Sequence, residues 1–248
     1  MNSHNIPIIS VFCYYDGIHV WKDGHKISAS DLSAIDMNCD EYFIKEVDSW
    51  CGVGARKIKA PIAWNTILNG KRFIIQPVVK NDESLRKLNP STLNTIRIAT
   101  CMKNASVELW DPGMLRVGRS GADVDNFFQG GIGVAIENDG SLCEYGFCHD
   151  KTRVYEKLTR HPDSGVIFAG YKIPFYQETV KLVKQAHLLF PTIPTIGWDV
   201  AITDKGPQIL EGNHDWDIEM LQIVRHEGQM RIRDRIYPPI INSRHKEK

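Results

Sequence analysis

Two acids and an amide in the stretch IGWDVAITDKGPQILEGNHDWD are spaced for chemistry on one face of a β-hairpin. Two strand-like runs flank the turn DKG, and a three-residue loop ending in Gly favours a type I turn with a G1 bulge. That turn pairs Thr203 with Pro207, so Asp199 is expected opposite Glu211. Their Cβ atoms would lie roughly 5 Å apart. Asn213 would share their face, one strand period further on.

Two facing carboxylates repel each other, so this pair costs stability unless a positive group lies between them. Carboxylate and amide oxygens suit Mg²⁺, which keeps part of its water shell and also binds phosphate groups. Asp199, Glu211 and Asn213 are therefore predicted to hold Mg²⁺. The alternative is a solvated strand face with ordinary acids, and the apolar neighbours on both strands argue against it.

A nucleotide held with Mg²⁺ would also need a lysine for its phosphates, a flexible loop and a slot for its base. Lys45 ends a strand in EYFIKEVDSWCGVG, and Gly52 and Gly54 could turn backbone N–H groups toward phosphate oxygens. No GK[ST] follows, so this is not a Walker loop, and a lysine ahead of two glycines can also be incidental. The apolar run FIIQPVV predicts a buried strand, either plain core or one whose Gln76 and Val78 backbones face an adenine edge.

Two arginines stand on strands among apolar neighbours, Arg97 in NTIRIAT and Arg116 in MLRVGR. An arginine in such a place usually needs an anionic partner, which is either a substrate group or a structural carboxylate. Asn126 precedes the diglycine of DNFFQGG, a pattern that is also compatible with a simple turn.

The composition is that of a soluble globular protein with balanced charge. The chain has 248 residues, and 30 Lys and Arg oppose 30 Asp and Glu, so charge favours neither nucleic acid nor an anionic membrane as a partner. The sequence has no signal peptide and no run of eighteen apolar residues, and its six cysteines form no CxxC pair. The cytoplasm is therefore the expected location. Cys143, Cys148 and His149 cluster but lack the second ligand pair of a structural zinc site.

Strands dominate the middle of the chain and helices flank it, which predicts an α+β fold. The expected strands lie at residues 7–15, 42–47, 55–59, 73–79, 95–102, 107–119, 131–147 with turn residues at 137–140, 196–203 and 207–213. Helices are expected from near Ser28 or Ser30, at 61–69, at 174–190 and at 220–237. The apolar face of the third helix is predicted to contain Tyr176, Val180, Val183, His187 and Leu188 or Phe190.

In their order along the chain, the lysine, the Gly loop, the buried strand, the two arginines, the Asn before the diglycine and the acidic hairpin resemble the ATP-grasp superfamily. Within it, the chain is most similar to the sugar-transfer-associated ATP-grasp family, which is related to α-L-glutamate ligases. The stretches NPSTLNTIRIAT, VGRSGADVDNFFQGGIGV, HPDSGVIFAGYKIPFY and IGWDVAITDKGPQILEGN carry the resemblance. It implies two α+β subdomains that grip ATP between antiparallel sheets. Residues 1–79 would form a nucleotide-lid subdomain with the Gly loop and a hinge strand, and residues 80–248 a C-terminal subdomain with the magnesium hairpin. The N-terminal subdomain that usually precedes them is expected to be absent. The acceptor pocket would then be reduced, or be completed by a partner protein or a second copy, or the catalytic role would have changed.

The resemblance also implies roles for single residues. Lys45 and the loop at 52–54 would bind the ATP phosphates, and residues 76–78 would form the adenine hinge. Glu211 would bridge two Mg²⁺ ions, with Asp199 and Asn213 as the remaining ligands.

Three further residues match the glutamate-ligase branch in this resemblance. Arg97 and Arg116 would neutralise the phosphate and the acyl phosphate, and Asn126 would open the N…GG turn. His214 and Asp215 could line the acceptor side, and His161 has no role that its sequence context indicates.

The implied activity is that of an ATP-dependent ligase that joins a carboxylate to an amine through an acyl phosphate, in glycan or cell-surface biosynthesis. ATP and Mg²⁺ would be its cofactors, and its substrates would be small molecules or glycans. Two alternatives stay open: a kinase on the same scaffold, and a non-catalytic nucleotide-binding or partner-binding module. Retention of Asp199, Glu211 and Asn213 counts against the non-catalytic module, because unused facing acids would cost stability.

Overall fold

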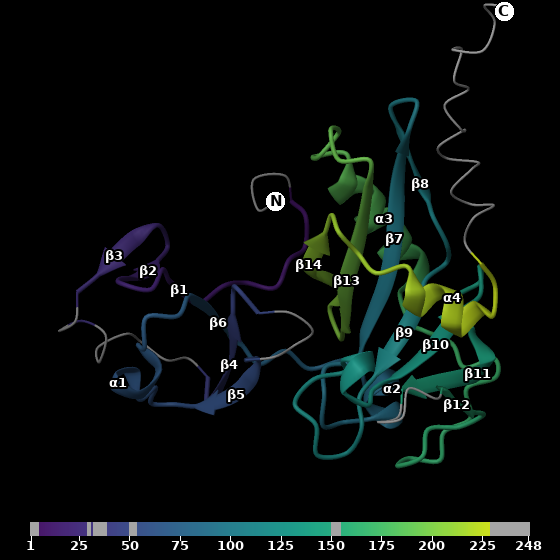
Figure 1. Ribbon diagram of the computed structural model, residues 1–248, viewed down its shortest axis with the longest axis horizontal. Coiled ribbons are helices and arrows are strands. Elements are labelled where there is room, and N and C mark those ends of the chain that lie inside the picture. Colours follow the sequence, from purple (N-terminus) through teal and green to yellow (C-terminus); the bar gives the residue numbers. More distant parts are fainter. Residues whose placement is uncertain (1–4, 29–30, 32–38, 50–53, 150–154, 229–248) are drawn as a thin grey trace, which may run out of the picture.

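Two antiparallel sheets organise the chain, which a computed structural model describes over residues 5–28, 31, 39–49, 54–149 and 155–228. The strands of the smaller sheet are β1 (Cys13–Tyr15), β2 (Val20–Lys22), β3 (His25–Ile27), β4 (Glu41–Glu46), β5 (Arg56–Lys59) and β6 (Phe73–Pro77). Their spatial order is β3-β2-β1-β6-β4-β5, and the short helix α1 (Trp64–Ile67) lies between β5 and β6 in the chain. This sheet lies at the left of Figure 1 and has its own core, which includes Tyr42, Ile44, Phe73 and Ile75.

The larger sheet has eight strands and lies at the right of Figure 1. Its members are β7 (Thr95–Lys103), β8 (Ser106–Leu109), β9 (Met114–Val117), β10 (Ile132–Ile136), β11 (Leu142–His149), β12 (Tyr155–Leu158), β13 (Thr195–Thr203) and β14 (Gly206–Asn213). The order is β12-β11-β10-β9-β7-β13-β14, and β8 pairs with β7 beside this path. The remaining elements are α2 (Glu83–Leu88), the 3₁₀ helix η3 (Phe127–Gln129), α3 (Tyr176–His187) and α4 (Glu219–Arg225).

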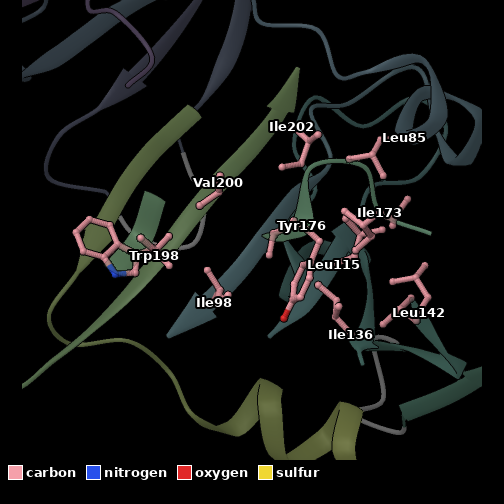
Figure 2. Close-up of a cluster of buried hydrophobic side chains, with 14 of the residues drawn as sticks. Leu85, Ile98, Leu115, Ile136, Leu142, Ile173, Tyr176, Trp198, Val200 and Ile202 are labelled. Atoms are coloured by element: carbon pink, nitrogen blue, oxygen red, sulfur yellow. The ribbon is translucent and has the colours of Figure 1, made fainter. Parts of the chain in front are cut away.

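Helices cover both faces of the larger sheet, because its central strand alternates apolar residues to both sides. Ile98 of β7 belongs to the core beneath α3, part of which is drawn in Figure 2 with Tyr176, Leu115 and Trp198. Its neighbour Ala99 belongs to the second core, which contains the side chains of α4 and η3. The face that carries η3 and α4 also carries Arg97, since side chains two positions apart on a strand share a face.

Most predicted elements are confirmed, with shifted ends. The expected strand at 107–119 is two strands, β8 and β9, separated by a turn at Asp111 whose carboxylate accepts the N–H of Gly113. The strand expected at 73–79 ends at Pro77. Helix α3 buries Tyr176, Val183 and His187 as predicted, and Thr179, Leu182 and Ala186 as well. Val180 and Phe190 are half-buried, and Leu188 is exposed, so the alternative with Leu188 on the apolar face is wrong. Five of the described elements were not predicted: β2, β3, α2, η3 and β12. The helix expected near Ser28 and Ser30 lies largely outside the described residues.

The strand expected at 7–15 is wrong over its first half. Only Cys13–Tyr15 forms β1, whereas Ile8 makes an isolated parallel bridge with Ile209 of the larger sheet. The N–H of Ile9 donates to the carbonyl of Ile209 at 2.9 Å, and the N–H of Ile209 donates to the carbonyl of Pro7 at 2.9 Å. The strands of the smaller sheet end at Pro77 and those of the larger sheet begin at Thr95, whereas this N-terminal segment pairs with the larger sheet.

No helix within the described part of the chain is both long enough and apolar enough to span a bilayer.

Candidate functional site

The hairpin of β13 and β14 places Asp199 opposite Glu211 as predicted, but its turn and register differ from those expected. Thr203 pairs with Gly206 and not with Pro207, so the turn holds only Asp204 and Lys205. Pro207 has no N–H to donate to a ladder, and Gly206 closes the turn with a φ of +101°.

A bulge between Asp199 and Val200 then restores the expected facing pair. Val200 lies opposite Ile209, whereas Asp199 lies opposite Glu211, so Leu210 is the extra residue. The predicted loop was therefore one residue too long, and the bulge offsets that difference. Asp199 and Glu211 do form a cross-strand pair, and Asn213 lies opposite Gly197 further along the same strand.

Two buried arginines neutralise Asp199. Arg97 lies opposite it on the neighbouring strand β7 and makes a two-pronged contact, Nε to Oδ1 at 2.5 Å and Nη2 to Oδ2 at 3.0 Å. Arg116 of β9 adds Nη2 to Oδ2 at 2.9 Å. Burial by itself raises the pKa of the Asp199 carboxyl, but the charges of Arg116 and Arg97 outweigh this effect and hold its pKa at about 2. Two guanidinium groups of the protein thus neutralise the Asp199 carboxylate and offset the expected repulsion.

Asp125 is a member of this cluster that the sequence did not reveal, because its place before Asn126 resembled an ordinary turn. Its Oδ2 accepts the backbone N–H of Thr95 at 2.9 Å and the Thr95 hydroxyl at 2.6 Å. The same hydroxyl oxygen accepts Arg116 Nε at 3.0 Å and Nη2 at 2.7 Å. Burial raises the pKa of Asp125, and Arg116 only partly opposes this. Thr95, held by Asp125, and Asp199 therefore both contact the Arg116 guanidinium.

Lys45 comes from the other sheet and reaches the same cluster. Its Nζ forms an ion pair with Oε2 of Glu211, so a strand of the smaller sheet is joined to the hairpin of the larger one. Burial lowers the pKa of Lys45, and the nearby charges of Arg116 and Arg97 lower it further, while Asp199 acts in the opposite sense. Five predicted residues, Lys45, Arg97, Arg116, Asp199 and Glu211, thus lie in one alternating network of charges.

The hairpin carries carboxylate and amide oxygens, the donor types that magnesium prefers. Glu211 is 31% exposed, and Asn213 on the same strand donates its amide N–H to Glu211 Oε1 at 3.3 Å. An ionised carboxylate has roughly four acceptor positions. At Asp199, three of them accept arginine N–H groups, so one position remains. Among the described residues, no three His, Cys, Asp or Glu side chains form a group that could hold a metal ion.

The residues predicted to bind adenine and to form the Gly loop lie in and near the smaller sheet. Gln76 is buried in β6 opposite Phe43, and Val78 lies just past the end of that strand, half-buried. Gly54 has a φ of +76° and packs on the side chain of Glu46, whereas Gly52 lies outside the described residues.

Two further residues have structural contacts. Asn126 caps η3, with its Oδ1 accepting the N–H of Phe128 at 2.9 Å. His161 is fully buried, and its Nε2 lies 2.9 Å from the carbonyl oxygen of Gly118. Its Nδ1 accepts the N–H groups of Asp163 and Ser164, so its ring closes a loop.

Comparison with known proteins gives a family and a set of solved structures with low similarity. No curated protein matches the chain. A structure of the ATP-grasp ligase PsnB, complexed with the precursor peptide PsnA2 and AMPPNP, is 10% identical with a TM-score of 0.47; the match covers 95% of this chain and 54% of that one. D-alanyl-alanine synthetase A from Vibrio cholerae O1 biovar eltor str. N16961 is 9% identical with a TM-score of 0.44, covering 95% and 61%. D-cycloserine synthetase DcsG is 13% identical with a TM-score of 0.45, covering 93% and 64%.

The chain spans between about half and two thirds of the length of these structures. The family model described as sugar-transfer associated ATP-grasp matches residues 65–236, which is more than half of the chain. This match confirms the resemblance that the sequence motifs indicated, together with the α+β ATP-grasp fold. The chain belongs to the sugar-transfer-associated ATP-grasp family.

Proposed function

We propose that this protein is an ATP-dependent ligase that joins a carboxylate to an amine through an acyl phosphate. The observation that carries the proposal is the convergence of three cationic side chains, Lys45, Arg97 and Arg116, from three strands of two sheets. Such a group suits the negative charge that a phosphoryl group carries during transfer. Membership of the ATP-grasp family supports the same activity.

In the proposed complex, Lys45 and the Gly loop at 52–54 bind the ATP phosphates. The backbone groups of Gln76 and Val78 bind the adenine. Two subdomains, at 1–79 and 80–248, close on the nucleotide from either side.

Asp199, Glu211 and Asn213 would hold Mg²⁺, which supplies positive charge next to the β- and γ-phosphate oxygens. Opening of the ion pair between Glu211 and Lys45 would free Oε2 of Glu211 for the cation. Opening this pair also releases the Lys45 ammonium for the phosphates, so both groups change partner together.

The reaction has two steps. A carboxylate oxygen of the first substrate attacks the γ-phosphorus, the bond to the β-phosphate oxygen breaks, and an acyl phosphate and ADP form. The amine of the second substrate then attacks the acyl carbon, inorganic phosphate leaves, and the amine loses one proton. Arg97 and Arg116 neutralise the transferring phosphoryl group and the leaving phosphate. Asn126 is a positioning residue, because it holds the turn that carries Asp125.

The description of the family links it to sugar transfer, which supports a glycan or cell-surface role for the product. A carboxylate-bearing or amine-bearing sugar would satisfy both the family description and the proposed chemistry.

Calorimetric titration with ATP, with and without Mg²⁺, tests the nucleotide site. Lys45→Ala should weaken ATP binding by about tenfold or more, since a hydrogen bond to a charged group contributes about 1.5 to 3 kcal/mol. Glu211→Gln should leave Mg²⁺-free ATP binding intact or stronger, because Lys45 loses its competing partner, and should abolish the gain from adding Mg²⁺. Lys71→Ala is the matched control, since this exposed lysine pairs with Glu46. Equal ATP affinity in Lys45→Ala and wild type would reject the phosphate role.

Product analysis separates ligase from kinase. With hydroxylamine as the amine and a panel of amino acids and uronic acids as carboxylates, a ligase releases ADP and forms a hydroxamate. A kinase would instead form a stable phosphate ester on a hydroxyl group and no hydroxamate. Formation of ADP with the ester as the only product would contradict the proposed reaction.

A further inference from the structure

A second pocket lies on the larger sheet, away from the ion-pair network. It has a volume of about 360 Å³ and is lined by Phe128, His149, Tyr155 and Glu219. These residues come from four different elements: η3, β11, β12 and α4. None of them belongs to the nucleotide or metal site described above.

The rings of Phe128, His149 and Tyr155 line this pocket, and neighbouring ring planes are steeply tilted relative to each other. The ring centroids of Phe128 and His149 are 6.0 Å apart with an interplanar angle of 66°. Those of His149 and Tyr155 are 5.7 Å apart, also at 66°. The Tyr155 hydroxyl donates to Oε1 of Glu219 at 3.1 Å, which holds one carboxylate beside the rings. Phe128 is 37% exposed, so its ring is open to solvent.

The pocket lies on the same face of the sheet as the ion-pair network. Arg116 pairs with Gly133 of β10, and Gly133 pairs with Phe147 of β11, so these three positions share a face. His149 lies two positions beyond Phe147 on β11 and pairs with Tyr155 of β12. Neighbouring strands are about 4.8 Å apart, so two to three strand spacings put the pocket on the order of 10 to 15 Å from Arg116.

The lining chemistry selects for positive charge. Aromatic faces attract ammonium groups through their quadrupoles, and aromatic cages recognise quaternary ammonium ligands. Glu219 adds a full negative charge, and Asp217 lies next to it with its Oδ1 accepting the Glu219 N–H at 2.7 Å. The protein already uses this chemistry on adjacent strands, because Nζ of Lys157 lies 3.4 Å above the ring of Tyr145.

We propose that the pocket formed by Phe128, His149, Tyr155 and Glu219 binds an organic ammonium group. The ligand is then a small organic cation, bound apart from the proposed nucleotide and metal residues, because the buried core under α4 and η3 fills the sheet face between the pocket and Arg116.

The test uses choline and its neutral isostere 3,3-dimethylbutan-1-ol as probes of the full-length protein without nucleotide. Saturation-transfer NMR titrations should give a dissociation constant for choline at least fivefold below that of the isostere. Glu219→Gln should weaken choline binding at least fivefold and leave the isostere unchanged. Phe128→Leu should weaken choline binding as well, because it removes one ring. Glu178→Gln, an exposed acid on α3, is the control with the same charge change and should bind like wild type.

Equal affinity for choline and the isostere would overturn the ammonium assignment, and no saturation of either probe would overturn the pocket. Circular dichroism checks that each variant is folded. Choline binding is measured without ATP, so the two proposals can fail separately. If the protein binds ATP but not choline, only the ammonium pocket is rejected. If it binds choline but not ATP, only the proposed ligase is rejected.

Discussion

At the scale of single residues, Asp199 is the centre of the site. It is 2% exposed, and its two oxygens accept from Arg97 and Arg116, which are themselves buried. A carboxylate with two arginine partners anchors them whether or not a metal is bound. Its role in stability can therefore be measured separately from any role in catalysis.

Replacing Asp199 with Asn should destabilise the fold by about 3 to 5 kcal/mol, because it leaves two buried guanidinium groups without their shared negative partner. Urea unfolding followed by tryptophan fluorescence measures this loss. Asp48→Asn is the control, since Asp48 and its partner Arg72 are exposed to solvent, and it should change little. A stability of Asp199→Asn equal to that of Asp48→Asn would contradict the anchoring role.

The same substitution carries a pH signature. The folded pKa of Asp199, about 2, is below the value of about 3.9 for an unfolded chain, so its ionised form stabilises the folded state. This contribution is complete above about pH 4 and is lost as the pH falls through 2. The stability difference between wild type and Asp199→Asn should therefore shrink as the pH is lowered from 4 toward 2.

At the scale of elements, the turn between η3 and β10 explains why two glycines follow Asn126. Gly130 has a φ of +91° and open space around it, so it is needed for its backbone conformation. Gly131 is needed for space, because an added Cβ would lie 2.5 Å from the carbonyl oxygen of Asp125 and 2.7 Å from that of Asn126. The diglycine thus lets the chain fold back onto the segment that carries Asp125.

Alanine at these two positions should have different consequences. Gly130→Ala should cost about 1 to 2 kcal/mol through backbone strain alone, and Gly130→Asn should cost less, because Asn adopts the left-handed conformation more readily. Gly131→Ala should cost about 1 to 3 kcal/mol through steric displacement and should also lower ADP formation, since it moves Asp125 away from Thr95 and Arg116. Thermal unfolding and turnover assays measure both effects. Unchanged turnover in Gly131→Ala would contradict the link between this turn and Arg116.

At the scale of the whole molecule, specific contacts join the two sheets. Lys45 pairs with Glu211, Nζ of Lys57 donates to the carbonyl of Ser91 at 2.8 Å, and the segment from Pro7 to Ile9 pairs with Ile209. Ile6 precedes the smaller sheet in the chain but is buried in the core of the larger one.

Ile6→Ala should therefore destabilise the larger sheet by about 2 to 4 kcal/mol, as expected for a large-to-small change in a core. Hydrogen exchange followed by mass spectrometry should show faster exchange in β13 and β14 and little change in β4 and β6. Ile44→Ala, in the core of the smaller sheet, is the matched control with the opposite pattern. Faster exchange confined to β4 and β6 in Ile6→Ala would mean that this segment belongs to the smaller sheet.

Much of the fold was readable from local patterns. Alternating and continuous apolar runs located most strands, and helical spacing located α3, because burial on one face imposes a period that the sequence must follow. The short strands β2, β3 and β12 have three or four residues each, too few to show such a period. The facing pair of Asp199 and Glu211 was predicted correctly, although the loop was read as one residue too long and the bulge at Leu210 was not foreseen.

The sequence by itself determined the residue types of the site, the strands that carry them and the family to which the chain belongs. Only the tertiary structure decided their partners: Arg97 binds a carboxylate 102 positions away, and Lys45 pairs with one 166 positions away. It also revealed the buried Asp125 and an aromatic pocket built from four separate elements. Local periodicity reports which face of a strand is buried, whereas ion pairs between distant strands depend on how sheets stack and register, which no local pattern encodes.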